Sequence, residues 1–345
     1  MAAAVVAPLP FAHGGPLLAG KLRTEPEDFF VDEVLGFEPS GAGEHAFVRI
    51  EKTGANTEWV ARRLAEKAGV AAVAIGYSGL KDRHAVTRQS FSVHLPGRAD
   101  PDWSALAIPG VRVLSATRHE RKLKRGSHRG NRFRIRVRDV DGSRDVAEQR
   151  IDAIRTRGVP NYFGEQRFGR EDGNIARARE LFAGRRLPRA EAGFALSAAR
   201  SLLFNAVLAE RVGEGNWDRA LDGEVWMLAG THSIFGPEPL TDELARRLAA
   251  FDIDPTGPLW GAGELRTSGR VREIEQHAIA PFGDLADGLA KAGLVQQRRA
   301  LRLPVGGLKH EYEYDGSLVL EFELSAGSFA TVVLRELCDP VVAAD

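Results

Sequence analysis

Strand-type sequence patterns lie at both ends of this chain, and helix-type patterns fill its middle. Apolar and polar residues alternate over 131–140, and alternation returns after Leu301, most clearly over 318–324. Helical spacing marks four segments between them, namely Ile175–Phe182, Glu191–Arg211, Thr241–Ala250 and Pro281–Lys291. The 345 residues are enough for two domains. This order predicts an α+β fold in which a mostly helical domain is inserted into a strand-rich one.

The segment 131–140 predicts a strand with two chemically different faces. Because side chains alternate along a strand, Phe133, Ile135 and Val137 fall on one face. The other face carries Arg132, Arg134, Arg136 and Arg138. Arginine suits phosphate because its planar fork donates two parallel hydrogen bonds. We therefore expect an apolar face in the core, and we expect Arg132, Arg134 and Arg136 to contact a polyanion backbone.

The charge distribution supports the same expectation. The whole chain has a net charge of zero, whereas residues 118–138 contain ten Lys or Arg residues against one acidic residue, Glu120, a net charge of +9. Such concentration on a neutral protein favours a polyanion bound to one face. A solvated or disordered basic loop explains the composition equally well.

Shorter signals predict the remaining elements. A turn at Pro26–Asp28 precedes a strand that begins at Phe29, and Asn56 and Gly69 delimit a helix. Further strands are expected over 44–52, 72–75, 90–95, 111–116, 301–305 and 311–314, and further helices over 143–157 and after Ser328.

A polar loop between two of these strands presents a single carboxylate, Asp82. The loop runs from Gly79 to Gln89, and its cationic residues are Lys81, Arg83, His84 and Arg88. Cations that lie this close can hold a carboxylate ionised as a nucleophile or base. A solvated Asp in an ordinary surface loop explains the local sequence as well.

Two aromatic segments are further candidates. The loop 159–169 contains Tyr162, Phe163 and Phe168, which could stack a nucleic-acid base or pack between domains. Phe329 lies where the last helix begins, and a helix N-terminus offers free N–H groups to an anion. A buried Phe that anchors the helix is the alternative.

Composition and missing motifs limit the chemistry. The single cysteine, Cys338, excludes an internal disulfide and any multi-cysteine zinc site, and favours a reducing, cytoplasmic compartment. No run of 18 uninterrupted apolar residues occurs, so we expect no membrane span. There is no zinc deaminase signature, no H-E-x-x-H and no P-loop, so we expect no metal. An Asp nucleophile without metal is the simplest catalytic interpretation.

Six motifs in order resemble those of the TruD family of tRNA pseudouridine synthases, over nearly the whole chain. They are Pro26-Glu27-Asp28-Phe29, Gly79-x-Lys81-Asp82-x-x-Ala85-x-Thr87-x-Gln89, Gly130-Asn131-x-Phe133, Asn161-Tyr162-Phe163-Gly164-x-Gln166-Arg167-Phe168-Gly169, Leu196-Ser197-Ala198-Ala199-Arg200-Ser201 and Ala326-Gly327-Ser328-Phe329-Ala330-Thr331. No single motif would suffice, but six in register make coincidence implausible.

The resemblance implies a discontinuous catalytic domain of residues 1–158 and 306–345, built on a mixed, largely antiparallel sheet. It implies an inserted, mostly helical α/β TRUD domain of residues 159–305, with a cleft between the two domains. It also implies isomerisation of uridine to pseudouridine in tRNA, at position 13 in the D arm, without a cofactor. Nothing in the sequence demands more than a monomer.

The resemblance also implies site residues. Asp82 would be the catalytic carboxylate, Phe29 and Phe329 would flank or stack the flipped uracil, and Asn131 would contact the substrate. Arg23 stands where most members have a Lys that pairs with the Asp, and Lys81 would support it. A covalent ribosyl route and a glycal route both stay open.

Two other functions stay open as well. A tRNA-binding protein or RNA chaperone without catalysis would explain the basic segment and the aromatics, but would leave Asp82 without a role. An RNA nucleosidase would release free uracil.

Overall fold

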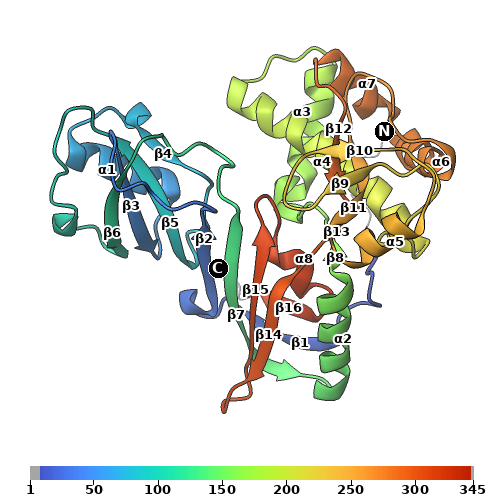
Figure 1. Cartoon of the computed structure of the whole chain (residues 1–345), viewed down its shortest axis with the longest axis horizontal. Helices are drawn as coiled ribbons and strands as arrows, with labels where there is room; N and C mark the ends of the chain where they lie inside the picture. Colours follow the sequence, from blue (N-terminus) through green and yellow to red (C-terminus); the bar gives the residue numbers. More distant parts are fainter. Residues whose placement is uncertain (1–7, 343–345) are drawn as a thin grey trace. The chain divides into compact units, whose positions relative to one another are not determined.

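The computed structural model describes residues 8–342, which form two compact units by their contacts (Figure 1). The sheet unit comprises 17–147, 305–327 and 338–342, and the helical unit comprises 8–16, 148–304 and 328–337. Contacts thus group 8–16, 148–158 and 328–337 with the helical segments, whereas the sequence placed them with the strands. The domain boundaries inferred from the sequence stay a prediction.

The sheet unit contains most of the strands and one complete helix. Its strands are β1 (Leu18–Leu22), β2 (Phe29–Val34), β3 (His45–Lys52), β4 (Ile75–Tyr77), β5 (Val86–His94), β6 (Val111–His119), β7 (Gly130–Asp141), β14 (Gly306–Tyr312), β15 (Leu318–Ser325) and β16 (Cys338–Val342). The helix is α1 (Thr57–Ala68). Gly69 ends α1 in the left-handed conformation, at φ 60°, as its sequence predicted.

These strands form one mixed sheet in the order β14-β15-β7-β2-β5-β3-β6. The pairs β2–β5 and β1–β16 are parallel, and the other pairs are antiparallel. The predicted mixed, largely antiparallel sheet is therefore confirmed. The late strand β15 pairs with the early strand β7 from Leu318 opposite Val137 to Ser325 opposite Gly130. This pairing explains why strand patterns occur at both ends of the chain.

The predicted faces of β7 are also confirmed. Phe133, Ile135 and Val137 are buried, whereas the arginines between them are exposed or half-buried. A second cluster, formed by β3, β4, β5 and α1, buries apolar side chains such as Val48, Leu64 and Phe91. Removal of these apolar surfaces from water is the main stabilisation of the sheet on which the candidate site is built.

The helical unit is built around α4 (Arg189–Gly213), which packs against α3, α6, α7 and β11. Its other helices are α2 (Arg144–Arg157, which begins in the sheet unit), α3 (Gly173–Phe182), α5 (Asp242–Ala249), α6 (Gly269–Ile279), α7 (Gly283–Lys291) and α8 (Ala330–Leu334). Two small sheets, β10-β9-β11-β12 and β13-β8, complete it. Their strands are β8 (Val159–Pro160), β9 (Trp226–Leu228), β10 (Ile234–Phe235), β11 (Ile253–Leu259), β12 (Gln297–Ala300) and β13 (Arg302–Leu303).

Several local predictions were wrong. Residues 72–74 form a 3-10 turn rather than the start of a strand, and β4 begins only at Ile75. The helix α8 is capped by Phe329 rather than by Ser328. The helix α6 and the four-stranded sheet were not predicted, although Val271, Ile274 and Ala278 recur at helical spacing in α6.

One helix among the described residues, α4, is long and apolar enough to cross a membrane by length and composition alone. In its most apolar window, 56% of the residues are buried inside the structure. The core helix of a soluble protein has the same properties, so this finding is weak evidence for a span.

Candidate active site around Asp82

Asp82 lies in the loop between β4 and β5, and its carboxylate has two partners. Oδ2 lies 3.1 Å from Nη2 of Arg23, and Oδ1 accepts a hydrogen bond of 3.0 Å from the backbone N–H of His84. The side chains of Asp82 and Arg23 retain 28% and 25% exposure. The carboxylate is thus oriented by two donors but remains accessible to a substrate.

Arg23 reaches Asp82 from the end of β1, where its backbone has a φ of 59°. Its guanidinium also lies over the ring of Phe29, at 4.6 Å from the ring centroid. Guanidinium groups favour such positions because the face of an aromatic ring is negative. Arg23 therefore links the predicted carboxylate to one of the predicted stacking residues.

The cations that neighbour Asp82 in sequence do not pair with it. Lys81 turns towards Glu33, and Arg88 pairs with Glu51 at 2.8 Å and lies over Phe30. Neither Lys81 nor Arg88 therefore forms an ion pair with Asp82, and the supporting role of Lys81 stays a prediction. The reason is the sheet, which brings other carboxylates closer to them than Asp82.

Phe29 is largely buried, with 6% exposure, at the start of β2. Its ring meets the ring of Phe133 edge to face, at a centroid distance of 6.4 Å. Because Arg23 covers one face of Phe29, a base that stacks on this face must displace the guanidinium from it. The stacking role of Phe29 stays a prediction.

Lys81, in the loop, contacts Asn131 of β7. Lys81 Nζ donates a hydrogen bond of 2.5 Å to Asn131 Oδ1 and lies 3.5 Å from Glu33 Oε2. Burial lowers the pKa of Lys81, and the charge of Glu33 acts in the opposite direction. Glu33 also accepts hydrogen bonds from the hydroxyl of Ser78 and the backbone N–H of Ser90. Ser78 is the first residue of the loop between β4 and β5, and Ser90 lies within β5, so this buried network ties the start of the loop, β5 and Lys81 to β2 and β7.

No sequence pattern had marked Lys52, the last residue of β3, as a site residue. Its ammonium donates hydrogen bonds to the carbonyl oxygens of Asp82, at 2.9 Å, and Lys81, at 3.4 Å. The residue has 0% exposure. Alternation along β3 could have revealed it, because Lys52 shares its face with the fully buried Ala46, Val48 and Ile50.

The arginine face of β7 is neutralised by acidic neighbours. Arg132 lies 2.7 Å from Glu323, and Arg134 lies 3.2 Å from Glu313 and 3.5 Å from Glu321. Arg136 pairs with Glu313 as well. These carboxylates come from β15 and the turn before it, which the local charge count of residues 118–138 did not include. RNA backbone contact by Arg132, Arg134 and Arg136 stays a prediction, and it would require these arginines to exchange partners.

Phe329 belongs to the helical unit, whereas the other predicted site residues belong to the sheet unit. It is half-buried at the N-terminus of α8. Its predicted contact with the uracil stays a prediction.

The aromatic residues of the loop 159–169 serve as packing. Tyr162, Phe163 and Phe168 have 1%, 8% and 2% exposure. The side chain of Asn205 bonds both the N–H and the carbonyl of Phe163, each at 2.9 Å. These rings therefore pack within the helical unit, as the packing alternative predicted.

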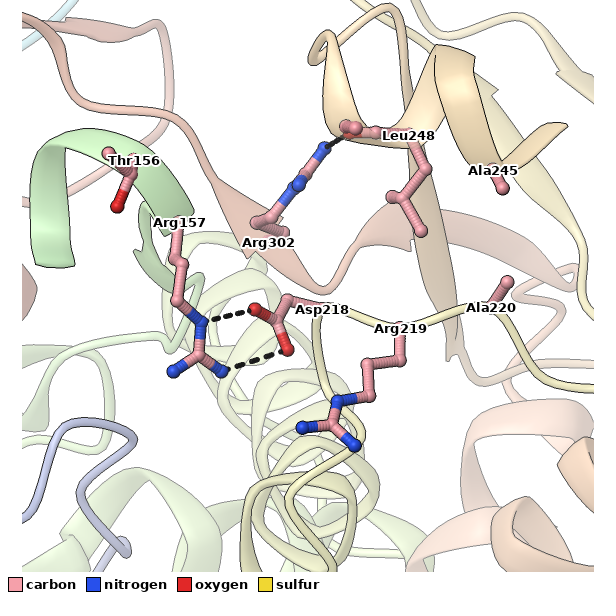
Figure 2. A pocket seen from close by; sticks show the side chains of 9 residues that line it. Thr156, Arg157, Asp218, Arg219, Ala220, Ala245, Leu248 and Arg302 are labelled. Carbon is pink, nitrogen blue, oxygen red and sulfur yellow. Dashed lines mark hydrogen bonds and ion pairs between the residues drawn. The ribbon is translucent and has the colours of Figure 1, made fainter. Parts of the chain in front are cut away.

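The helical unit also contains a cavity of about 380 Å³, lined by residues of α2, α5 and the segment after α4 (Figure 2). Two of its arginines have partners: Arg157 forms two hydrogen bonds with Asp218, and Arg302 donates to the carbonyl oxygen of Leu248. No predicted site residue lines it. Across residues 8–342, no group of three His, Cys, Asp or Glu residues is arranged to hold a metal ion.

Known proteins are similar to this sequence over nearly its whole length. A family model described as tRNA pseudouridine synthase D (TruD) matches residues 10–181 and 173–337. The tRNA pseudouridine synthase D of Xanthomonas campestris pv. campestris is 52% identical over 97% of this chain and 96% of that protein. The corresponding protein of Methylococcus capsulatus is 51% identical over 96% of this chain and 94% of its own length.

A crystal structure of the TruD protein from Methanosarcina mazei superimposes with a TM-score of 0.72. The match covers 96% of both chains at 22% sequence identity, and so supports the fold alone. The family model and the curated relatives extend over nearly the whole chain, including every motif quoted from the sequence. The chain therefore belongs to the TruD family of tRNA pseudouridine synthases.

Proposed function

We propose that this protein isomerises uridine to pseudouridine at position 13 in the D arm of tRNA, with Asp82 as the catalytic carboxylate. Family membership supports the reaction and the substrate class. The observation that carries the assignment to Asp82 is its geometry: a partly exposed carboxylate, held by Arg23 and by the N–H of His84.

The reaction breaks the glycosidic bond, turns the uracil and rejoins it to the ribose through carbon. Atoms and electrons balance within the nucleotide, so no redox partner or group donor is required. Asp82 would either attack the ribose or remove a proton from it, and both routes need an oriented, negatively charged oxygen. Arg23 balances that charge, and the N–H of His84 fixes the orientation of the carboxylate.

The target uridine must first leave its stack, which costs a few kcal/mol. Aromatic stacking can offset about 1–3 kcal/mol of that cost for each base. Phe29, next to Arg23, and Phe329, at the start of α8, are the candidates for this contact. Asn131, which Lys81 orients through its side-chain oxygen, would bind the substrate with its amide N–H groups.

The test compares the wild-type protein with Asp82→Asn on unmodified tRNA. We expect the wild type to form pseudouridine at position 13, mapped with a carbodiimide label, and Asp82→Asn to form none. The variant should still bind the tRNA, because the change is nearly isosteric. Turnover by Asp82→Asn would remove the residue from its role, and modification at another position would correct the proposed site.

The same experiment separates the other functions. A wild-type protein that binds tRNA but leaves every uridine unmodified would be an RNA-binding protein or chaperone. Release of free uracil would indicate a nucleosidase. We further propose that the protein acts in the cytoplasm, since its single cysteine is buried and free. We also propose that it is a monomer. Light scattering of the purified protein and of its tRNA complex tests the monomer.

A further inference from the structure

We propose that Lys52 is a positioning residue that fixes the backbone of Asp82 for catalysis. This inference rests on the proposed role of Asp82. Lys52 does not touch the carboxylate. Instead, its ammonium donates to the carbonyl oxygen of Asp82 itself, at 2.9 Å, and to that of Lys81, at 3.4 Å.

The contact is one of several that brace the loop from the segment 52–57. The hydroxyl of Thr57 accepts a hydrogen bond of 3.0 Å from the N–H of Lys81, and the N–H of Gly54 donates one of 2.8 Å to the carbonyl of Arg83. The backbone of Lys81, Asp82 and Arg83 is thus attached at three successive residues to the end of β3 and the start of α1. In this brace, Lys52 supplies the bond to Asp82.

The energetics of Lys52 are unusual for a purely structural residue. Its side chain is fully buried, and the partners of its ammonium among the described residues are two backbone carbonyl oxygens rather than a carboxylate. Burial of an ammonium is unfavourable when no opposite charge compensates it. Burial accordingly lowers its pKa to about 8; the charge of Asp82 opposes this shift, and the charge of Lys81 reinforces it.

The neighbouring inward positions of β3 show what the fold alone would select. Ala46, Val48 and Ile50 occupy the same face and are fully buried apolar residues. A lysine at the next inward position weakens the core but places three donors under the loop that carries Asp82. A group that costs stability and contacts the reactive segment is explained by positioning, because catalysis depends on the placement of reacting groups within a fraction of an ångström.

The test is the kinetics of Lys52→Met, which keeps the length of the side chain but removes its donors. We expect kcat to fall about 100-fold, as a displacement of about 1 Å would cause. KM and the affinity for unmodified tRNA should stay within about twofold, because the RNA surface is unchanged. Lys309→Met, an exposed lysine of β14, is the matched control and should keep wild-type kinetics.

Two further measurements distinguish positioning from folding. In Lys52→Met, amide hydrogen exchange in peptides that cover 79–85 should accelerate, while exchange in β7 stays unchanged. Lys52→Arg retains donors for both carbonyl oxygens and should recover most of the lost kcat.

Several outcomes would overturn the inference. They are a kcat of Lys52→Met within twofold of wild type, a Lys52→Met chain that does not fold, or a folded Lys52→Arg that is no more active than Lys52→Met. Failure of the proposed function has a different signature, since the wild type would then form no pseudouridine, or Asp82→Asn would retain activity.

Discussion

Arg23 Nη2 lies 3.1 Å from Asp82 Oδ2, and the same guanidinium covers the ring of Phe29 at 4.6 Å. One side chain therefore contacts both the predicted catalytic carboxylate and a predicted stacking residue. If a bound base displaced the guanidinium from Phe29, the ion pair with Asp82 would be the main contact that holds Arg23. Arg23 thus couples the occupancy of the aromatic face to the environment of Asp82.

Replacement of Arg23 tests this coupling. We expect Arg23→Ala to lower kcat about 100-fold, because Asp82 loses its ion pair and one of its two orienting donors. Arg23→Lys should be intermediate, since an ammonium can pair with Asp82 but lacks the planar overlap with Phe29. Single-turnover pseudouridine assays measure both, with the exposed Arg63→Ala of α1 as the control. Equal rates for wild type and Arg23→Ala would contradict the prediction.

The ion-paired arginines of β7 predict opposite effects on RNA binding for two kinds of substitution, namely loss of the arginines and loss of an acidic partner. If Arg132, Arg134 and Arg136 bind RNA phosphates, their joint replacement by Ala should lower the slope of log affinity against log salt by about one for each phosphate that is no longer bound. Glu323→Gln should strengthen binding at low salt, because it releases Arg132 from its partner. Filter binding of unmodified tRNA at several salt concentrations measures both. An unchanged slope in the triple variant would mean that these three arginines only form ion pairs with the neighbouring carboxylates.

The stability of the fold should depend on pH through Lys52. Its pKa is about 8 in the folded chain, against an ordinary value of 10.5. Between these values the unfolded chain binds one more proton than the folded chain, so the free energy of unfolding rises with pH. We expect wild type to gain up to about 3 kcal/mol over Lys52→Met between pH 7.5 and 10.5. Urea unfolding of both proteins at several pH values measures the difference, and parallel curves would refute it.

Cys338 should be unreactive in the native protein. It is fully buried at the start of β16, and burial raises the pKa of its thiol to about 11. Because the thiolate is the nucleophile, a thiol of this kind reacts slowly at neutral pH. Titration with a thiol reagent should give no rapid reaction in buffer and one thiol per chain in denaturant. Rapid native labelling would show that β16 opens readily from β1.

The order of strand, helix and strand patterns, and the two faces of β7, could be predicted from the sequence. Both depend on local periodicity, which reflects burial on one side of an element. The same local information failed for residues 72–74 and for the cap residue of α8, because short elements depend on their tertiary surroundings. Asp82 could be singled out because its loop interrupts two apolar runs.

The partners of these residues depended on the sheet. Charge attraction acts through space, so the cations adjacent to Asp82 in sequence, such as Lys81 and Arg88, pair with carboxylates on other strands. The arginine face of β7 lost its apparent excess charge for the same reason, since β15 aligns Glu321 and Glu323 beside it.

The family, the α+β class and the carboxylate most suited to the chemistry were evident in the sequence, because motifs and periodicity are local properties of the chain. The pairing of Arg23 with Asp82 was expected from the family resemblance and is present in the structure, whereas the contact of Lys52 became known only from the fold. Arg23 arrives from β1 and Lys52 from β3, and neither contact follows from spacing along the chain. Strand pairing and burial bring these groups together, and both are properties of the whole sheet.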